Sequence, residues 1–95
     1  MIVNRRTFIA KAGLPEKAVE ILKSGLVFVP FQQKYRIYIS DIAPFSQVAL
    51  EIEFKDLAEY DLFWTGTMEK TTDDWWQLWF SVTENGGQNE IWKHA

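Results

Sequence analysis

The sequence predicts an α+β fold in which strands and helices follow one another in the order β-α-β-β-α-β. Three observations lead to this order. First, a helix with a proline near its start separates two strand-like runs. Second, residues 46–54 alternate strictly between apolar and polar side chains. Third, residues 71–82 place apolar side chains at helical spacing. Because 95 residues are the length of one domain, we expect residues 1–95 to fold as a single unit.

A strand and a helix are expected at the start of the chain. Residues 4–13 contain the predicted strand, with Asn4 ahead of its first residue, and Phe8 and Ala10 share one of its faces. Residues 13–25 predict the helix, since a proline suits its first turn and a glycine suits its end. The apolar side chains of this helix fall on one stripe, which marks the face that it buries: Leu14, Ala18, Ile21, Leu22 and Leu26.

Two further strands are expected in the middle of the chain. Residues 35–42 are rich in the β-branched and aromatic side chains typical of a strand, and a turn with Pro44 follows them. Residues 46–54 predict a strand that buries one face, because its alternation gives it an apolar side and a polar side. Residues 26–34 fit an extension of the first helix, a short edge strand or a packed loop.

A helix in two pieces is expected next. Asp56 can cap the first piece, Glu59 completes a capping box, and Gly66 is expected to end it. The second piece covers residues 71–82, where a threonine cap and two aspartates complement the start of a helix. Its apolar side chains share one face: Trp75, Leu78, Trp79 and Val82.

The end of the chain completes the topology. Residues 84–87 predict a turn, because Asn and Gly accept positive φ, and residues 88–95 predict a short last strand. The resulting order is the ferredoxin-like arrangement, one sheet with its helices on one face. The other face needs a cover, and we expect a second copy of the chain to provide it. Two sheets that face each other would form a homodimeric α+β barrel.

Composition and charge exclude several classes of function. The net charge of −3 and the lack of a basic patch argue against nucleic acid as a partner. No apolar run reaches the length of a membrane span, and the first residues lack the pattern of a signal peptide, so we expect a cytoplasmic protein. Without cysteine there is no disulfide and no thiolate zinc site, and no other residues converge to suggest a metal site.

Tryptophan is concentrated in one part of the chain. Four of the five tryptophans, Trp64, Trp75, Trp76 and Trp79, lie within residues 63–80. They either fill the core between helices and sheet or line a cavity that binds a flat aromatic molecule. Adjacent residues on a helix point about 100° apart, so we expect Trp76 to meet solvent, a loop or a partner subunit, together with Phe80.

Several polar side chains are candidates for the same site. Tyr38 and Tyr60 could position a phenolic ligand. Glu51 and Glu53 share the polar face of their strand, where buried charge requires a partner. We expect Arg6 and Arg36 to provide it in cross-strand ion pairs, and the alternative is that one carboxylate serves as an acid or base.

Two segments of the sequence carry a resemblance to known proteins. The run "SDIAPFSQVALEIEFKDLAEYDLFW", followed by a helix rich in acids and tryptophan, and the closing "ENGGQNEIWK" resemble the NIPSNAP-like and antibiotic-biosynthesis-monooxygenase-like small dimeric α+β barrel proteins. The resemblance extends from Arg6 to Lys93. It implies a ferredoxin-like dimeric barrel. These groups contain cofactor-independent oxygenases of aromatic polyketides, haem-degrading enzymes and many members without a known activity.

One departure from these groups concerns haem. Haem-degrading members use an Asn, a Trp and an axial His. In this chain the only histidine is His94, next to the last residue, and Asn4 is expected to precede the first strand. We therefore expect no haem and no other cofactor.

The function predicted from sequence is a small dimeric barrel that binds a small apolar or aromatic molecule between helices and sheet. The alternative is a cofactor-independent monooxygenase or related enzyme that acts on an aromatic substrate. An enclosed cavity of roughly 300 Å³ or more, with convergent polar groups, would favour the enzyme. The lack of a plausible His–acid or Ser–His pair favours the binding protein.

Overall fold

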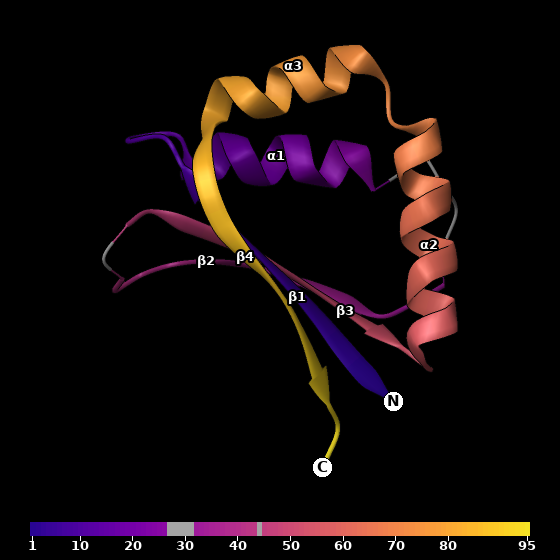
Figure 1. Ribbon diagram of the computed structural model, residues 1–95. Helices are drawn as coiled ribbons and strands as arrows, with labels where there is room; N and C mark the ends of the chain where they lie inside the picture. The colour runs from indigo at the N-terminus through magenta and orange to yellow at the C-terminus, as the bar shows by residue number, and fades with distance from the viewer. Residues whose placement is uncertain (27–31, 44) are drawn as a thin grey trace.

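The computed structural model describes residues 1–26, 32–43 and 45–95 (Figure 1). Its elements are β1 (Ile2–Ala10), α1 (Pro15–Gly25), β2 (Tyr35–Ile39), β3 (Gln47–Phe54), α2 (Leu57–Lys70), α3 (Asp73–Val82) and β4 (Thr83–Lys93). The predicted order β-α-β-β-α-β is confirmed, with the second helix divided into α2 and α3. Most of residues 26–34 and Pro44 lie outside the described residues, so the alternatives for that segment and the turn at Pro44 stay predictions.

The four strands form one antiparallel sheet in the order β2-β3-β1-β4. This is the ferredoxin-like order predicted from the sequence, with β1 and β3 at the centre. All three helices lie on the same side of the sheet (Figure 1). The face opposite to the helices is called the open face below.

The alternation predicted for β3 is confirmed. Val48, Leu50, Ile52 and Phe54 are at most 1% exposed, whereas the residues between them are only partly buried. The predicted stripe of α1 is buried against this layer at Ala18, Ile21 and Leu22. The aromatic side chains Phe63, Trp75 and Trp79 complete the core between the sheet and the helices.

The two helix N-caps form as predicted, but one predicted helix end is wrong. The Glu59 carboxylate does not complete the predicted capping box, since it accepts from Gln33 Nε2 at 3.0 Å. Asp56 Oδ1 accepts the Glu59 N–H at 2.9 Å, and Thr72 Oγ1 accepts the Trp75 N–H at 3.2 Å. Gly66 does not end the helix, since α2 continues through it to Lys70. A glycine inside a helix costs only about 1 kcal/mol, and the surrounding hydrogen bonds and packing outweigh that cost.

The predicted turn at residues 84–87 is also wrong, because β4 runs without interruption from Thr83 to Lys93. Gly86 and Gly87 have φ of 110° and 102°, and beside them the register of the pairing with β1 shifts by two residues, from Thr7 opposite Gln88 to Ile9 opposite Glu84. A Cβ at Gly87 would collide with the Thr7 carbonyl oxygen. The positive φ values that suggested a turn instead form a bulge, which bends β4 while keeping it in the sheet.

The bounds of two other strands differ from those predicted. β1 starts at Ile2, so Asn4 lies inside the strand and not ahead of it, and β2 ends at Ile39 instead of residue 42. The reason for the first difference is pairing: Asn4 lies between Ile52 of β3 and Ile91 of β4. Strand ends are set by such pairing, which alternation in a single segment does not reveal.

Candidate functional site

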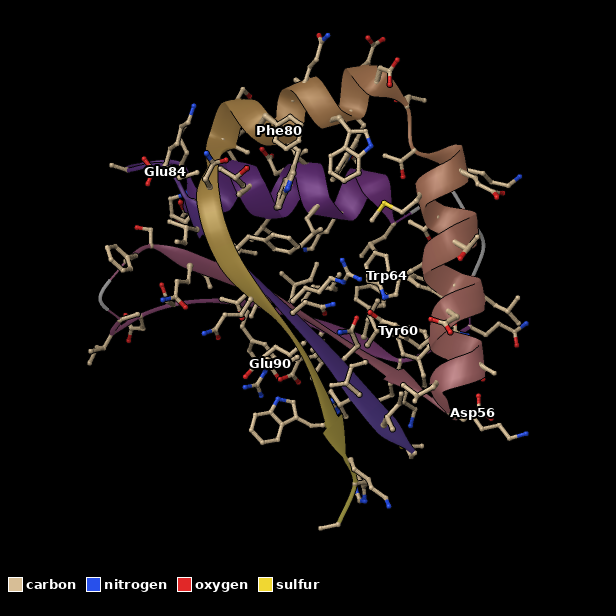
Figure 2. All side chains as sticks on the ribbon, viewed as in Figure 1. Asp56, Tyr60, Trp64, Phe80, Glu84 and Glu90 are labelled. Atoms are coloured by element: carbon tan, nitrogen blue, oxygen red, sulfur yellow. The ribbon has the colours of Figure 1, made fainter. Side chains whose placement is uncertain are left out.

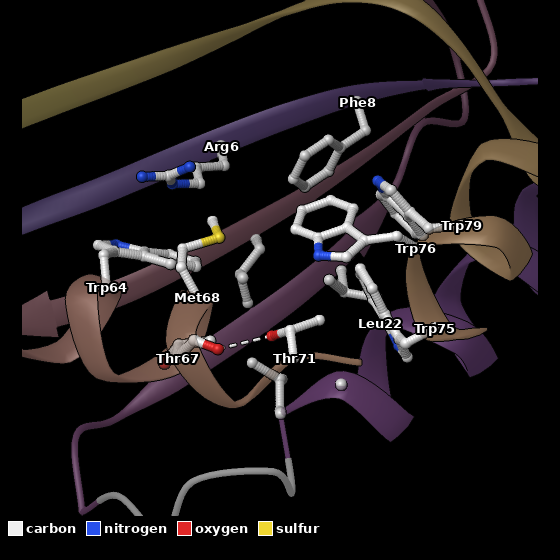
Figure 3. Close-up of a pocket in the computed structure, with 13 residues that line it drawn as sticks. Arg6, Phe8, Leu22, Trp64, Thr67, Met68, Thr71, Trp75, Trp76 and Trp79 are labelled. Carbon is white, nitrogen blue, oxygen red and sulfur yellow. Dashed lines mark hydrogen bonds between the residues drawn. The ribbon is translucent and has the colours of Figure 1, made fainter. Parts of the chain in front are cut away.

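A small cavity lies between the helices and the sheet, and we call it the tryptophan pocket (Figure 3). Its volume is about 80 Å³. The aromatic residues that line it are Phe8, Trp64, Trp75, Trp76 and Trp79. The polar residues that line it are Arg6, Thr67 and Thr71. The structure therefore brings together the four tryptophans that the sequence predicted to share a core or a cavity.

Trp75 and Trp79 form the buried side of the pocket. Their rings stack with centroids 5.5 Å apart, and Phe8 from β1 meets Trp79 edge-on at 4.9 Å. The Trp75 indole N–H donates to the Ile21 carbonyl oxygen at 2.8 Å. The ring lies directly over Gly25, where a Cβ would approach it to 2.8 Å. These contacts fix the two rings, so this side of the pocket is rigid.

Trp76 was expected to point away from the core, but its ring turns toward the pocket. It lines the pocket next to Phe8, and its ring meets Trp75 edge-on at 5.1 Å (Figure 3). The Trp76 ring also stacks on that of Phe80, which is 63% exposed. A long side chain can turn back over the preceding residues of its helix, so the 100° between neighbouring Cα positions does not fix where the ring lies.

Arg6 provides the charge of the pocket. Its guanidinium carbon lies 3.8 Å from the centre of the Trp64 ring, a cation–π contact. Figure 3 shows the two side chains stacked, with Arg6 extending from β1 and Trp64 from α2. Because β1 alternates its faces, Arg6 faces the helices whereas Arg5 faces the open side. The predicted ion-pair role of Arg6 on the polar face of β3 is therefore wrong.

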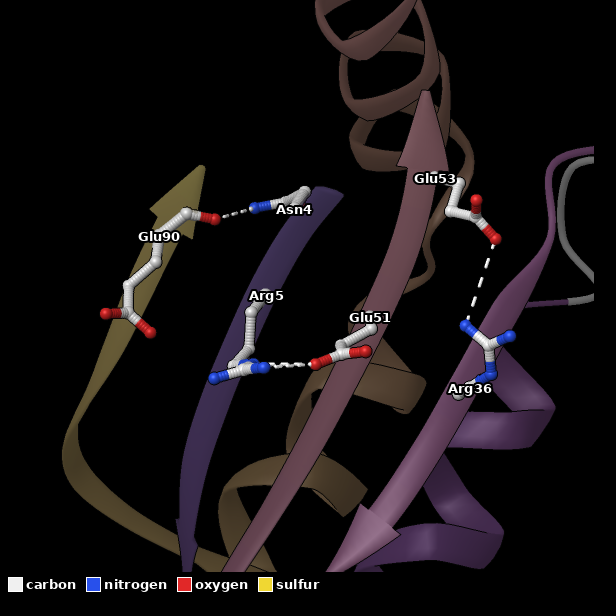
Figure 4. Close-up of polar contacts among 6 residues, drawn as sticks. All are labelled: Asn4, Arg5, Arg36, Glu51, Glu53 and Glu90. Carbon is white, nitrogen blue, oxygen red and sulfur yellow. Dashed lines mark hydrogen bonds and ion pairs between the residues drawn. The ribbon is translucent and has the colours of Figure 1, made fainter. Parts of the chain in front are cut away.

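A fully buried asparagine organises the Arg6 end of the pocket. Asn4 Nδ2 donates to Asn89 Oδ1 at 2.7 Å. It also donates to the Glu90 carbonyl oxygen at 3.0 Å, the bond drawn in Figure 4. Asn4 Oδ1 accepts the Trp64 indole N–H at 3.0 Å and the Arg6 Nε–H at 3.4 Å. Sequence reasoning missed this residue. The spacing along β1 could have indicated its role. Asn4 lies two residues before Arg6 and four before Phe8, so the three side chains share one face of the strand.

The two candidate tyrosines lie apart. Tyr60 belongs to the asparagine network, since its hydroxyl oxygen accepts from Asn89 Nδ2 at 3.2 Å and from Arg6 Nη2 at 3.4 Å. Figure 2 shows Tyr60 and Trp64 on successive turns of α2, directed toward the sheet. Tyr38 is half exposed and pairs with Ala49, which places it on the open face.

The charged residues of the open face form ion pairs across strands (Figure 4). Arg5 Nη2 lies 2.6 Å from Glu51 Oε2, and Arg36 Nη1 lies 3.9 Å from Glu53 Oε2. Arg36 thus occupies the position expected from the sequence, and Arg5 takes the one expected for Arg6. Glu51 and Glu53 face away from the tryptophan pocket, so neither can act on a molecule bound there.

The polar groups of the pocket have limited chemistry. Thr71 Oγ1 donates to the Thr67 carbonyl oxygen at 2.6 Å, and Thr67 Oγ1 is buried without a hydrogen-bond partner. Among the described residues that line the pocket, Arg6 alone carries a charge. The described part of the chain contains no cluster of three or more potential metal ligands. None of its helices is long and apolar enough to cross a membrane.

The residues present do not fit haem. Asn4 and Trp64 are in contact inside the fold, which the sequence had not indicated. However, the exposed His94 follows β4 at the end of the chain, where its backbone N–H donates to the Met1 carbonyl oxygen at 3.1 Å. No histidine lines the pocket, and about 80 Å³ is far below the roughly 300–1,000 Å³ of sites for drug-sized ligands.

Solved structures share this architecture. An uncharacterized NIPSNAP domain protein from Burkholderia xenovorans matches all of this chain and 95% of its own, with a TM-score of 0.78 and 15% identity. A NIPSNAP family protein from Agrobacterium tumefaciens matches 99% of this chain and 92% of its own, with a TM-score of 0.75 and 18% identity. A structure of antibiotic biosynthesis monooxygenase matches all of this chain and 99% of its own, with a TM-score of 0.66 and 12% identity.

Sequence comparison adds no closer assignment. No family model matches the chain, and no curated protein matches it. At identities of 12–18%, the structural matches establish the fold alone. The chain therefore has the ferredoxin-like α+β fold found in NIPSNAP family proteins and in antibiotic biosynthesis monooxygenase, as its sequence suggested.

Proposed function

We propose that this chain is a non-enzymatic binding protein that holds a small aromatic molecule in the tryptophan pocket. The observation that carries the proposal is the composition of the pocket, where Phe8, Trp64 and Trp76 surround a cavity whose lining also includes the cation of Arg6 and a threonine with an unpartnered hydroxyl. Aromatic side chains contact a flat ring in stacked or edge-on geometry, and a few polar groups fix its orientation. The proposed ligand lies between helices and sheet.

The size of the pocket restricts the ligand. A cavity that binds benzene measures about 150 Å³, roughly twice the 80 Å³ found here. Binding therefore requires a side chain to move. Met68 lines the pocket from α2 and is 43% exposed, and a flexible thioether side chain can be displaced into solvent at low cost. A molecule with a single aromatic ring is the size that such a displacement accommodates.

The chemistry of the pocket favours binding over catalysis. A cofactor-independent oxygenase that acts on an aromatic substrate needs a group that can take a proton from it. The described residues that line the pocket include no carboxylate, histidine or lysine. The monooxygenase alternative predicts that the purified protein consumes oxygen with a phenolic substrate, and an oxygen electrode would detect it.

We also propose that the open face is the contact between two copies of the chain. Its strands β1, β3 and β2 carry charges of both signs, Arg5 beside Glu51 and Arg36 beside Glu53, so a two-fold axis can bring unlike charges of two copies together. Trp92 lies on this face beside Val3, and 54% of its surface is exposed. Burying a tryptophan of this size would contribute strongly to association. Light scattering at micromolar concentration tests this assembly, and a stable monomer would contradict it.

Nuclear magnetic resonance of the indole N–H groups tests the binding proposal. The chain has five tryptophans, four at the pocket and Trp92 on the other face of the sheet. Titration with benzamide, a neutral single ring, should shift the indole signals of the pocket and leave that of Trp92 in place. Trp76→Ala should remove the response, whereas Leu62→Ala, at a residue that is 77% exposed on α2, should keep it. Equal shifts of all five signals would contradict a specific site.

A further inference from the structure

The side chain of Arg6 lies in the pocket without a counter-ion. The 13 Asp and Glu residues all fall within the described ranges, and none of them forms an ion pair with Arg6. Its nearest polar partners are neutral, Asn4 Oδ1 and the Tyr60 hydroxyl, both at 3.4 Å. A guanidinium has five N–H donors in a planar fork, so most of its donor capacity is unused.

The neighbouring arginine shows the contrast. Arg5 makes two close contacts with Glu51 Oε2, at 2.6 and 2.7 Å, although its side chain is 44% exposed. Arg6 is the less exposed of the two residues and faces an apolar cavity, where an unpaired charge is more costly. The contact with Trp64 compensates part of this cost on one face of the guanidinium and leaves its edge available.

The opposite side of the pocket adds a second unpaired polar group. Thr67 Oγ1 is buried and has no hydrogen-bond partner, whereas Thr71 Oγ1 is bonded to the Thr67 carbonyl oxygen. Figure 3 shows Arg6 on the β1 side of the pocket and Thr67 on the α2 side. A guanidinium is only a donor, whereas a hydroxyl can donate or accept, so a ligand with acceptor oxygen atoms can satisfy both.

We propose that the ligand of the tryptophan pocket is an aromatic carboxylate, whose ring packs against the tryptophans and whose carboxylate group binds the edge of the Arg6 guanidinium. This inference rests on the proposed binding function and specifies the chemical class of its ligand. A carboxylate matches the planar fork of an arginine with two parallel hydrogen bonds, which are stronger than bonds between neutral groups. The net charge of −3 disfavours nonspecific anion binding elsewhere on the protein.

Benzoate and benzamide form the test pair, because they have the same shape and differ in charge. With the unmodified protein, benzoate should bind at least about tenfold more tightly than benzamide, as expected when a hydrogen bond to a neutral group is replaced by one between charged groups. Arg6→Gln should abolish this preference, so that benzoate and benzamide bind to the variant with equal affinity, whatever that affinity is. Arg6→Lys should retain part of the preference, because the charge remains but the two-bond geometry is lost.

Lys17→Gln is the matched control, since it removes one positive charge at an exposed position of α1. Its preference for benzoate should equal that of the unmodified protein. Equal binding of benzoate and benzamide to the unmodified protein would overturn the carboxylate inference and leave the binding function standing. A preference that survives Arg6→Gln would also overturn it. Failure of both molecules to bind would contradict the proposed function itself.

Discussion

The Trp64 indole N–H donates a hydrogen bond to Asn4 Oδ1 at 3.0 Å, and this bond joins the middle of α2 to the centre of the sheet. The same oxygen atom receives the Arg6 Nε–H, and the Arg6 guanidinium lies over the Trp64 ring. One buried amide therefore fixes both the aromatic side and the charged group of the pocket. Because Asn4 is fully buried, removing its side chain leaves the Trp64 indole N–H and the Glu90 carbonyl oxygen without this partner inside the fold.

Asn4→Ala should lower the free energy of unfolding by about 2–4 kcal/mol, since it removes all the hydrogen bonds of a fully buried side chain. Urea denaturation followed by tryptophan fluorescence measures this change. Asn85→Ala, at an exposed position of β4, serves as the control and should stay within about 0.5 kcal/mol of the unmodified protein. A loss below 0.5 kcal/mol for Asn4→Ala would show that the network contributes little to stability.

Two helical glycines should respond in opposite directions to alanine. Gly25→Ala should destabilise the protein by about 1–3 kcal/mol, because the new Cβ would lie 2.8 Å from the Trp75 ring, which is fixed by its bond to Ile21. Gly66→Ala should stabilise the protein by about 0.5–1 kcal/mol, since a Cβ at this position would have no neighbouring atom within 4 Å and alanine favours a helix more than glycine does. Thermal unfolding of both variants measures the two effects. Stabilisation by both substitutions would show that the Trp75 ring yields easily.

Two threonines of the pocket form another matched pair. Thr67→Val should stabilise the free protein by about 1 kcal/mol, because it removes a buried hydroxyl without a partner and keeps the shape of the side chain. Thr71→Val should destabilise it by about 1 kcal/mol, since it removes the 2.6 Å bond to the Thr67 carbonyl oxygen. Chemical denaturation measures the free energy of unfolding of both variants. If Thr67→Val is the more harmful, its hydroxyl has a partner in solution.

The proposed dimer can be tested at the centre of the open face. Ala49 lies between Thr7 of β1 and Tyr38 of β2, in the middle of that face. Ala49→Arg should shift the protein from dimer to monomer, because a long charged side chain would have to enter the contact between two sheets. Size-exclusion chromatography with light scattering measures the mass. Leu62→Arg, on the exposed side of α2, is the control and should leave the mass unchanged.

The sequence determined the topology. The period-two pattern of residues 47–54 and the capping residues at Asp56 and Thr72 are local features, and local features were sufficient to predict a strand and two helix starts. The wrong predictions concerned glycines, which are compatible with more than one local structure. Gly66 was compatible with a helix end or a helix interior, and α2 continues through it. Gly86 was compatible with a turn or a bulge, and the pairing of β4 with the distant strand β1 decided between them.

The site was decided by the tertiary structure. The sequence indicated that Trp64, Trp75, Trp76 and Trp79 belong to one apolar region, but it did not reveal that Arg6 would lie over Trp64 or that Asn4 would bond to it. Residues 4 and 64 are 60 positions apart, and whether they meet depends on the strand register and on the rotation of α2 above the sheet. A period of two assigns each residue of a strand to a face, whereas a contact between side chains requires the position of both elements in space.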